Sequence, residues 1–287
     1  MTMPSIHSSN AAQADFWNGK GGQRWADHQD RHDALLQPIS TQLLELAEPK
    51  SGEFVLDIGC GCGATTRALA AQVAPEGEAL GLDVSETMLR QARERTPEDL
   101  PVRYVRADAT VYEPPPGEID LVVSRFGVMF FADPAHSFAN LRKGMKPGAR
   151  LAFACWRAAK ENPWMIVPLR AAAEHAPPLP ELGPEDPGPF AFADGDRVRQ
   201  ILYDAGFLDV DIEPVDFEID VALGEGLDSA VQIAMELGPT SRMLEDQPET
   251  TRAAASKAIR AALATHAVGR RVPLGAAVWM VTASNPG

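Results

Sequence analysis

The sequence has few cysteines, few positive charges and no long apolar run. Its 287 residues include three cysteines, and 26 Lys and Arg stand against 40 Asp and Glu, for a net charge of −14. A chain this negative repels phosphate backbones, so we expect no nucleic-acid partner. No apolar run is long enough to cross a bilayer, and the chain does not open with the basic start and apolar core of a signal peptide. We therefore expect a cytoplasmic protein without stable membrane insertion.

The three cysteines do not form a recognisable metal-binding pattern. Cys60 and Cys62 are separated by one glycine, which is too close for a usual zinc pair, and no partner pair follows them. Cys155 stands alone at the end of an apolar run. The sequence therefore predicts neither a metal site nor a disulfide.

What the sequence does contain is a strand followed by a glycine-rich turn. Residues 54–58 form a short apolar run typical of a buried parallel strand, and Gly59, Gly61 and Gly63 follow it at alternate positions. A segment compatible with a helix comes next. This order of strand, glycine turn and helix lets backbone N–H groups come close to a nucleotide-like ligand.

The glycine pattern by itself fits two kinds of ligand. Residues 59–64 also satisfy the dinucleotide fingerprint, so an NAD(P)-dependent oxidoreductase remains an alternative. Asp57 favours a different ligand, because a carboxylate at this strand end would repel a pyrophosphate and attract a cation. S-adenosylmethionine carries an ammonium and a sulfonium group, so the charge favours this methyl donor.

The run from Val55 to Gly63 resembles the first motif of the class I S-adenosylmethionine-dependent methyltransferases, and is most similar to the ubiquinone/menaquinone-type C-methyltransferases. The resemblance covers roughly residues 50–156. It implies a Rossmann-like, doubly wound α/β sheet of seven strands, whose seventh strand is antiparallel and lies between the fifth and sixth. It also implies S-adenosyl-L-methionine as the cofactor.

The expected domain organisation follows from this resemblance. Residues 1–48 should form an N-terminal helical cap, interrupted at 19–22 and near Pro38, and residues 49–287 the methyltransferase domain. Acceptor-side insertions are expected at 157–192 and 224–270. The second should hold two helices, at 228–237 and about 249–266.

Further ligand groups are expected at the ends of the following strands. Asp83 comes about 20 residues after the glycine turn, where an acid can accept both ribose hydroxyls, and Asp108 suits the exocyclic amine of adenine. In the resembled family the end of the fourth strand lies under the methyl group. The predicted cofactor residues are Asp57, Gly59, Gly61, Gly63, Asp83, Val84, Met88, Asp108, Ala109, Ser124 and Arg125.

The acceptor residues rest on the resemblance. It implies that the N-terminal helical segment and the segment after the fourth strand enclose the acceptor. The predicted acceptor residues are Trp17, Trp25, His28, Phe126, Met129, Phe130 and Trp156. No histidine stands in a recognisable dyad, so no catalytic residue is assigned, and the sequence indicates no oligomeric state.

The sequence therefore predicts an enzyme, a methyltransferase that acts at carbon or oxygen of a small-molecule acceptor. Methyl transfer is a displacement at an already activated sulfonium, for which the protein mainly supplies proximity, orientation and dry surroundings. The alternatives are the NAD(P)-dependent oxidoreductase and a non-catalytic protein that binds S-adenosylmethionine.

Overall fold

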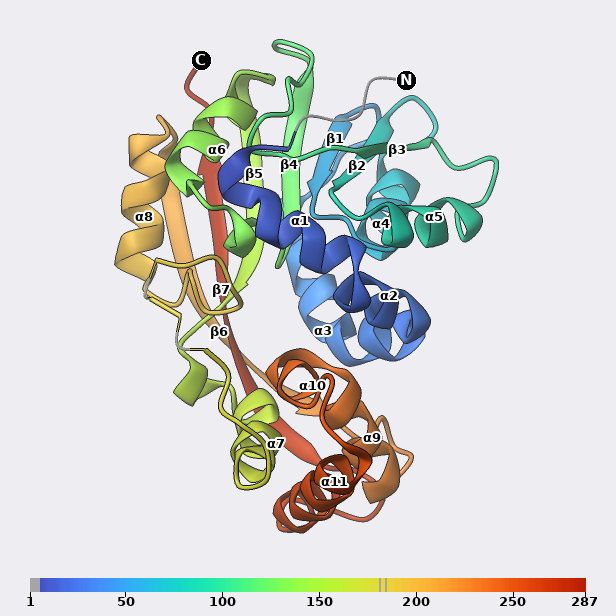
Figure 1. Cartoon of the computed structure of the whole chain (residues 1–287). Coiled ribbons are helices and arrows are strands. Elements are labelled where there is room, and N and C mark those ends of the chain that lie inside the picture. The colour runs from blue at the N-terminus through green and yellow to red at the C-terminus, as the bar shows by residue number, and fades with distance from the viewer. Residues whose placement is uncertain (1–5, 181, 184) are drawn as a thin grey trace.

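One sheet of seven strands organises the computed structural model, which describes residues 6–180, 182–183 and 185–287. The strand order is β3-β2-β1-β4-β5-β7-β6 (Figure 1). Neighbouring strands from β3 to β5 are parallel, and β7 runs antiparallel to both β5 and β6. The predicted doubly wound sheet, with its antiparallel strand in that place, is confirmed. The strands are β1 (Phe54–Ile58), β2 (Glu78–Asp83), β3 (Val102–Arg106), β4 (Ile119–Arg125), β5 (Met145–Trp156), β6 (Leu208–Asp220) and β7 (Pro273–Ser284).

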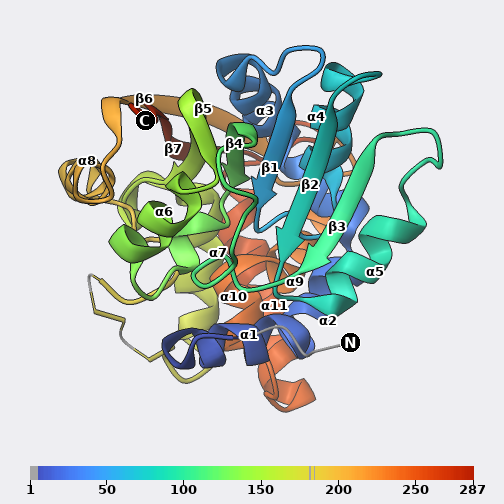
Figure 2. The same ribbon diagram turned by 90° about the horizontal axis from the view of Figure 1, so that it is seen from above.

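Helices cover both faces of the sheet. In the view from above, α3 and α4 lie on one face and α6 and α8 on the other (Figure 2). The helices are α1 (Ala11–Asn18), α2 (Lys20–Asp27), α3 (Gln29–Ala47), α4 (Ala64–Val73), α5 (Glu86–Glu94), α6 (Pro134–Arg142), α7 (Pro163–Ala173), α8 (Gly195–Asp204), α9 (Leu227–Glu236), α10 (Gly238–Met243) and α11 (Glu249–Ala264), with 3₁₀ turns η1 (Ser8–Asn10), η2 (Val128–Phe130) and η3 (Ala159–Glu161).

Helix α3 belongs to the main core. Leu35, Ile39 and Leu43 recur at helical spacing and are fully or almost fully buried against the sheet. The break expected near Pro38 is wrong, because α3 continues through that residue. A proline inside a helix costs one hydrogen bond and some strain, and the burial of this apolar face on both sides of it outweighs that cost. The break expected at 19–22 is confirmed by the boundary between α1 and α2 at Gly19.

An aromatic cluster fills the core between α6 and the sheet. The Phe138 ring on α6 is fully buried, and its centroid lies 5.5 Å from that of Phe131 and 5.7 Å from that of Phe153. The ring centroids of Phe192 and Phe207 each lie 6.4 Å from that of Phe138. Residues from four other segments therefore pack around one ring.

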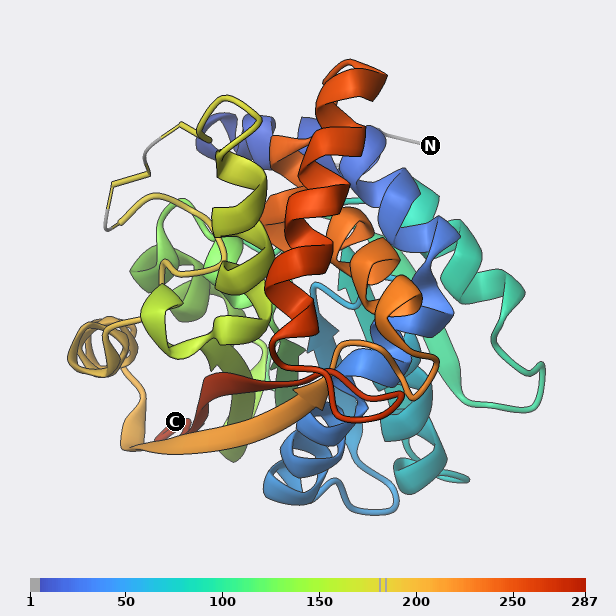
Figure 3. The ribbon, with the colours of Figure 1, turned by 90° about the horizontal axis from the view of Figure 1, so that it is seen from below.

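Four helices form a second layer below the carboxyl-end side of the sheet. Helices α7, α9, α10 and α11 pack side by side at the end of the long β6–β7 pair (Figures 1 and 3). The expected insertion 224–270 holds three helices rather than two. Helix α10 was missed because Gly238-Pro239 reads as a turn, whereas a proline in the first turn also starts a helix. In the described part of the chain, no helix is long and apolar enough to span a membrane.

Candidate functional site

A cavity of about 470 Å³ opens at the carboxyl ends of β1 to β5. The floor consists of residues at or just after those strand ends, and the walls come from the N-terminal helices and from α7, α9 and α10. Its volume falls within the range of roughly 300–1,000 Å³ typical of small-molecule sites. Parallel strands end at one edge of the sheet, which brings residues distant in sequence into a single site.

The three glycines of the turn after β1 have different surroundings. All three have positive φ, and a Cβ added to Gly61 would have only Met88 and Trp25 near it, at 3.8 Å and 4.0 Å. A Cβ at Gly63 would lie 2.3 Å from the Tyr104 hydroxyl, and one at Gly59 would lie 2.7 Å from the backbone of Gly127. Gly61 therefore faces the cavity, whereas Gly59 and Gly63 allow close packing beneath it.

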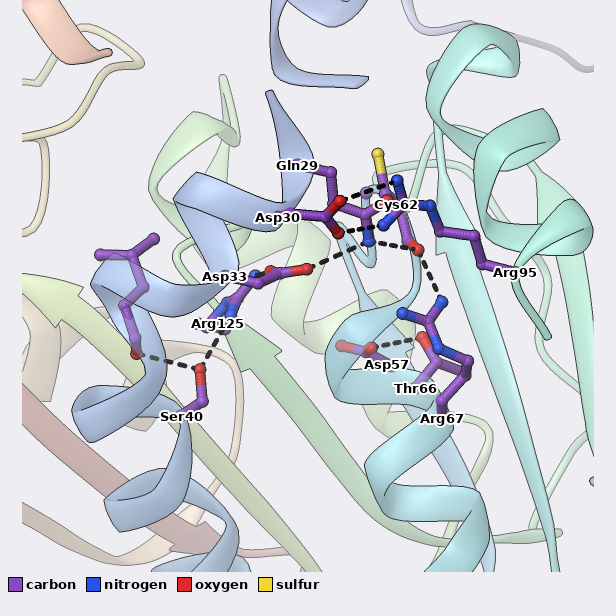
Figure 4. A network of polar contacts seen from close by, with 12 residues as sticks. Gln29, Asp30, Asp33, Ser40, Asp57, Cys62, Thr66, Arg67, Arg95 and Arg125 are labelled. Atoms are coloured by element: carbon purple, nitrogen blue, oxygen red, sulfur yellow. Dashed lines mark hydrogen bonds and ion pairs between the residues drawn. The ribbon is translucent and has the colours of Figure 1, made fainter. Parts of the chain in front are cut away.

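Asp57 is a buried carboxylate at the end of β1. It is 1% exposed, lines the cavity, and accepts a hydrogen bond of 2.6 Å from the Thr66 hydroxyl (Figure 4). Burial raises the pKa of Asp57 to about 7, although the Thr66 hydrogen bond opposes the rise. A carboxylate in such surroundings is stabilised by a cationic group that reaches it from the cavity.

Asp83 and Asp108 occupy the ends of the next two strands. Asp83 accepts hydrogen bonds of 2.8 Å from the backbone N–H groups of Gly61 and Ser85, one on each oxygen. Asp108 accepts a bond of 3.0 Å from the His7 N–H and one of 2.9 Å from the Asn10 amide. Both carboxylates line the cavity and are fixed in place by the surrounding backbone and by the N-terminal segment.

The N-terminal helices are held over the site by hydrogen bonds to the loop after β2. The Asn18 amide donates to the Val84 carbonyl at 3.0 Å and accepts from the Glu86 N–H at 3.1 Å. The Ser85 hydroxyl donates to the Trp17 carbonyl at 2.5 Å. These bonds place Trp17 and Trp25 in the cavity wall.

An aromatic wall stands at the ends of β4 and β5. The Phe126 ring stacks on that of Trp156 with centroids 4.1 Å apart, and Trp164 packs against Trp156 at 5.3 Å. Phe126 has a φ of 65°, which is strained for a bulky residue and directs the chain sharply out of β4. On the other side, Trp17 packs on Phe130 at 5.4 Å.

Most of the predicted site residues are brought together. The predicted residues that line the cavity are Asp57, Gly59, Gly61, Asp83, Val84, Met88, Asp108, Ala109, Arg125, Trp17, Trp25, Phe126, Met129, Phe130 and Trp156.

Three predicted residues do not line the cavity in the part of the chain that the structure describes. Gly63 packs on Tyr104, and Ser124 lies below the floor, where its hydroxyl donates to the Ile58 carbonyl at 2.8 Å. His28 lies outside the cavity, with its Nδ1 3.3 Å from Glu236 Oε2 of α9.

Several cavity residues were missed, and they share a property. Asn10 Oδ1, Gln29 Oε1, Trp164 Nε1 and both ring nitrogens of His32 are buried without a hydrogen-bond partner among the described residues. Buried polar atoms are rarely left unsatisfied, so these atoms indicate where a ligand would supply bonds. No sequence signal singles them out, since Gln29 and His32 stand in a run of polar residues and Trp164 follows a proline as an ordinary aromatic residue.

Residues 55–148 match a protein family described as a methyltransferase domain. The biotin biosynthesis bifunctional protein BioCD of Bordetella avium is 34% identical over 162 residues, which are 55% of this chain and 33% of that protein. This chain thus spans about a third of that relative. A nocamycin O-methyltransferase of Saccharothrix syringae is 28% identical over 205 residues, 67% of this chain and 72% of the relative.

Among solved structures, the chain superposes on a phosphoethanolamine N-methyltransferase of Haemonchus contortus in complex with S-adenosyl-L-methionine. The TM-score is 0.59 at 18% sequence identity, and the superposition covers 99% of this chain and 61% of that one.

Proposed function

The chain belongs to the class I S-adenosylmethionine-dependent methyltransferases, and from this premise we propose that it methylates a small, largely apolar acceptor bound in the strand-end cavity. The observation that carries the proposal is that the carboxylates of three strand ends and several aromatic side chains line the same cavity. The carboxylates suit the cationic and hydroxylated methyl donor, and the aromatic side chains a flat organic acceptor.

The cofactor is S-adenosyl-L-methionine, and the residues present fit it. We assign the methionine ammonium to Asp57, the ribose hydroxyls to Asp83, and the adenine amine to Asp108 together with the unpartnered Asn10 Oδ1. Each carboxylate oxygen that already accepts one bond retains acceptor capacity for a second. When bound, the cofactor supplies an electrophilic methyl group, and the aromatic wall excludes water from its surroundings.

The acceptor class is inferred from the aromatic part of the cavity. Phe126, Trp156 and Trp164 offer stacking surfaces, and Trp17 and Phe130 face the site from the cap and η2. Such walls favour flat apolar molecules, because aromatic pairs add about 0.5–1.5 kcal/mol to the gain from burial. The relative named nocamycin O-methyltransferase supports a small-molecule acceptor and methylation at oxygen. Methylation at carbon is the alternative that the same cavity permits.

Calorimetric titration of the purified protein with S-adenosylmethionine, S-adenosylhomocysteine and NADH tests the proposal. We expect the two adenosyl ligands to bind in the micromolar range, near −8 kcal/mol, and NADH not to bind, since Asp57 would repel its pyrophosphate. Binding of NADH alone would contradict the cofactor assignment and favour an oxidoreductase. Transfer of a labelled methyl group to an added acceptor separates an enzyme from a protein that only binds the donor.

Affinity for S-adenosylmethionine should decrease as the pH is lowered below neutral. The ammonium group requires Asp57 in its charged form, and with a pKa of about 7 the charged fraction falls below that pH. The expected loss is roughly tenfold between about pH 7 and pH 5.5, because the cofactor binds only the ionised carboxyl. Calorimetric titration across this pH range measures the loss of affinity. The Asp57→Asn variant cannot ionise there and should bind weakly with a flatter pH profile. If the affinity of Asp57→Asn for S-adenosylmethionine depended on pH as steeply as that of the wild type, Asp57 would be excluded as the titrating group.

A further inference from the structure

His32 is a buried histidine whose two ring nitrogens have no hydrogen-bond partner among the described residues. It is 2% exposed and lines the cavity. A buried polar group left unsatisfied destabilises the fold, so an apolar residue of similar size would stabilise the fold better. The ring is therefore placed where a ligand can satisfy it.

The position of His32 on α3 is fixed by contacts on either side. One turn before it, the Gln29 amide donates to the Cys62 carbonyl of the glycine turn at 3.2 Å, and the next residue, Asp33, pairs with Arg125 at the end of β4 at 3.0 Å (Figure 4). Arg125 also donates to the Ser40 hydroxyl at 2.8 Å. These contacts hold His32 between the glycine turn and the end of β4, both of which line the cavity.

The surroundings keep the imidazole neutral. Burial, together with the neighbouring His28, Arg125, Arg24 and Arg31, lowers the pKa of His32 to about 3. A neutral imidazole has one nitrogen that accepts a hydrogen bond and one N–H that donates. The Trp25 ring, with its centroid 4.4 Å from that of His32, provides an apolar neighbour for the rest of a ligand.

We propose that His32 accepts a hydrogen bond from a phenolic or enolic hydroxyl of the acceptor, so that this oxygen is the methylated atom. The inference rests on the proposed function and narrows it to O-methylation. The acceptor oxygen forms a bond to the methyl carbon while the carbon–sulfur bond breaks and its electron pair stays on sulfur. The neutral ring orients the hydroxyl oxygen, and the hydroxyl proton leaves to water. Reactants and products balance as methyl ether, S-adenosylhomocysteine and one proton.

The test compares hydroxylated probes with their methyl ethers on the protein saturated with S-adenosylhomocysteine. The probes are phenol, 2-naphthol and 1-hydroxyanthraquinone, which differ in size, each with its methyl ether, and calorimetry measures their affinity. At least one hydroxyl compound should bind about tenfold more tightly than its ether, since a site built to pair with a hydroxyl discriminates against an analogue without it. Methyl transfer to that probe from labelled S-adenosylmethionine is a second readout.

Two variants assign the preference to His32. In His32→Leu, which removes the polar atoms, the preference for the hydroxyl should fall to about twofold or less, whereas His32→Gln retains an acceptor oxygen and should keep part of it. His266→Gln is the control, since that histidine lies exposed just after α11. Affinity for S-adenosylhomocysteine should change by no more than about threefold in all three, within 0.7 kcal/mol. Thermal unfolding checks that each variant is folded.

The possible results separate this inference from the proposed function. Failure of the wild-type protein to bind S-adenosylhomocysteine contradicts the proposed function and this inference with it. Binding of S-adenosylhomocysteine without preference for any hydroxyl probe contradicts only the role of His32. A preference for the hydroxyl probe over its methyl ether that survives in both His32 variants also contradicts only the role of His32. A loss of S-adenosylhomocysteine affinity greater than about tenfold in His32→Leu, or 1.4 kcal/mol, would assign His32 to the cofactor instead.

Discussion

Replacing Asp83 with alanine should weaken the binding of S-adenosylmethionine about a hundredfold, which corresponds to about 2.7 kcal/mol. The substitution removes the carboxylate that we assign to the ribose hydroxyls, and each charge-assisted hydrogen bond of this kind contributes about 1.5–3 kcal/mol. It also frees the Gly61 N–H, which donates to Asp83 at 2.8 Å and so helps to shape the glycine turn. The effect therefore combines lost contacts with a less ordered turn.

Calorimetry with S-adenosylmethionine and S-adenosylhomocysteine measures this change. Asp83→Asn keeps one acceptor oxygen and should lie between the wild type and the alanine variant. Glu78→Gln is a matched control, because Glu78 begins the same strand at the opposite end and pairs with Arg103 outside the site. Its affinity should stay within about twofold of wild type, or 0.4 kcal/mol. A folded Asp83→Ala protein with wild-type affinity would exclude Asp83 from the cofactor site.

Replacing Phe138 with alanine should lower the free energy of unfolding by about 3–5 kcal/mol. The ring is fully buried, and its neighbours come from the loop before α6, from β5 and from the segments on either side of α8. Removal leaves a cavity that surrounding side chains from so many segments cannot all collapse to fill. A typical domain has a stability of only about 5–15 kcal/mol, so the loss would be a large part of the total.

Urea unfolding followed by circular dichroism measures this change. Tyr203→Ala on α8 is the control, since the Tyr203 side chain is 46% exposed and its truncation should cost less than about 0.5 kcal/mol. A loss below about 1 kcal/mol for Phe138→Ala would mean that the aromatic cluster repacks around the missing ring. The two variants together separate the effect of burial from that of losing an aromatic group.

The cofactor side of the site was predictable because its signals are local. A short apolar strand that carries Asp57 near its end and is followed by alternating glycines specifies a strand, a turn and an open backbone within ten or so residues. Asp83 and Asp108 were found by the same reasoning, since each lies at or just after the end of a strand. Once the strands are parallel, their carboxyl ends must meet at one edge, and the structure places all three carboxylates in one cavity there. Their roles toward the cofactor remain predictions.

The acceptor side was less predictable because it depends on which way each helix faces. His28 and His32 lie one turn apart, and the sequence favoured His28 because it is close to Trp25. The docking of α3 on the sheet directs His32 into the cavity and leaves His28 at Glu236 of α9. Residues four apart share a helix face, so the two histidines differ in their position along the axis of α3, which the long-range packing of Leu35 and Ile39 fixes.

The sequence by itself located the strands and the carboxylates at their ends, and its resemblance to a known family implied the class of protein and the place of the antiparallel strand. The strands and carboxylates follow from the spacing of apolar residues, glycines and acids along short segments, where backbone geometry leaves few alternatives. The tertiary structure alone decided which polar atoms remain without partners, that Gly61 rather than Gly63 faces the cavity, and that three helices wall its acceptor side. These features depend on contacts between residues far apart in the sequence, such as Asn10 and Asp108, which only the packed chain brings together.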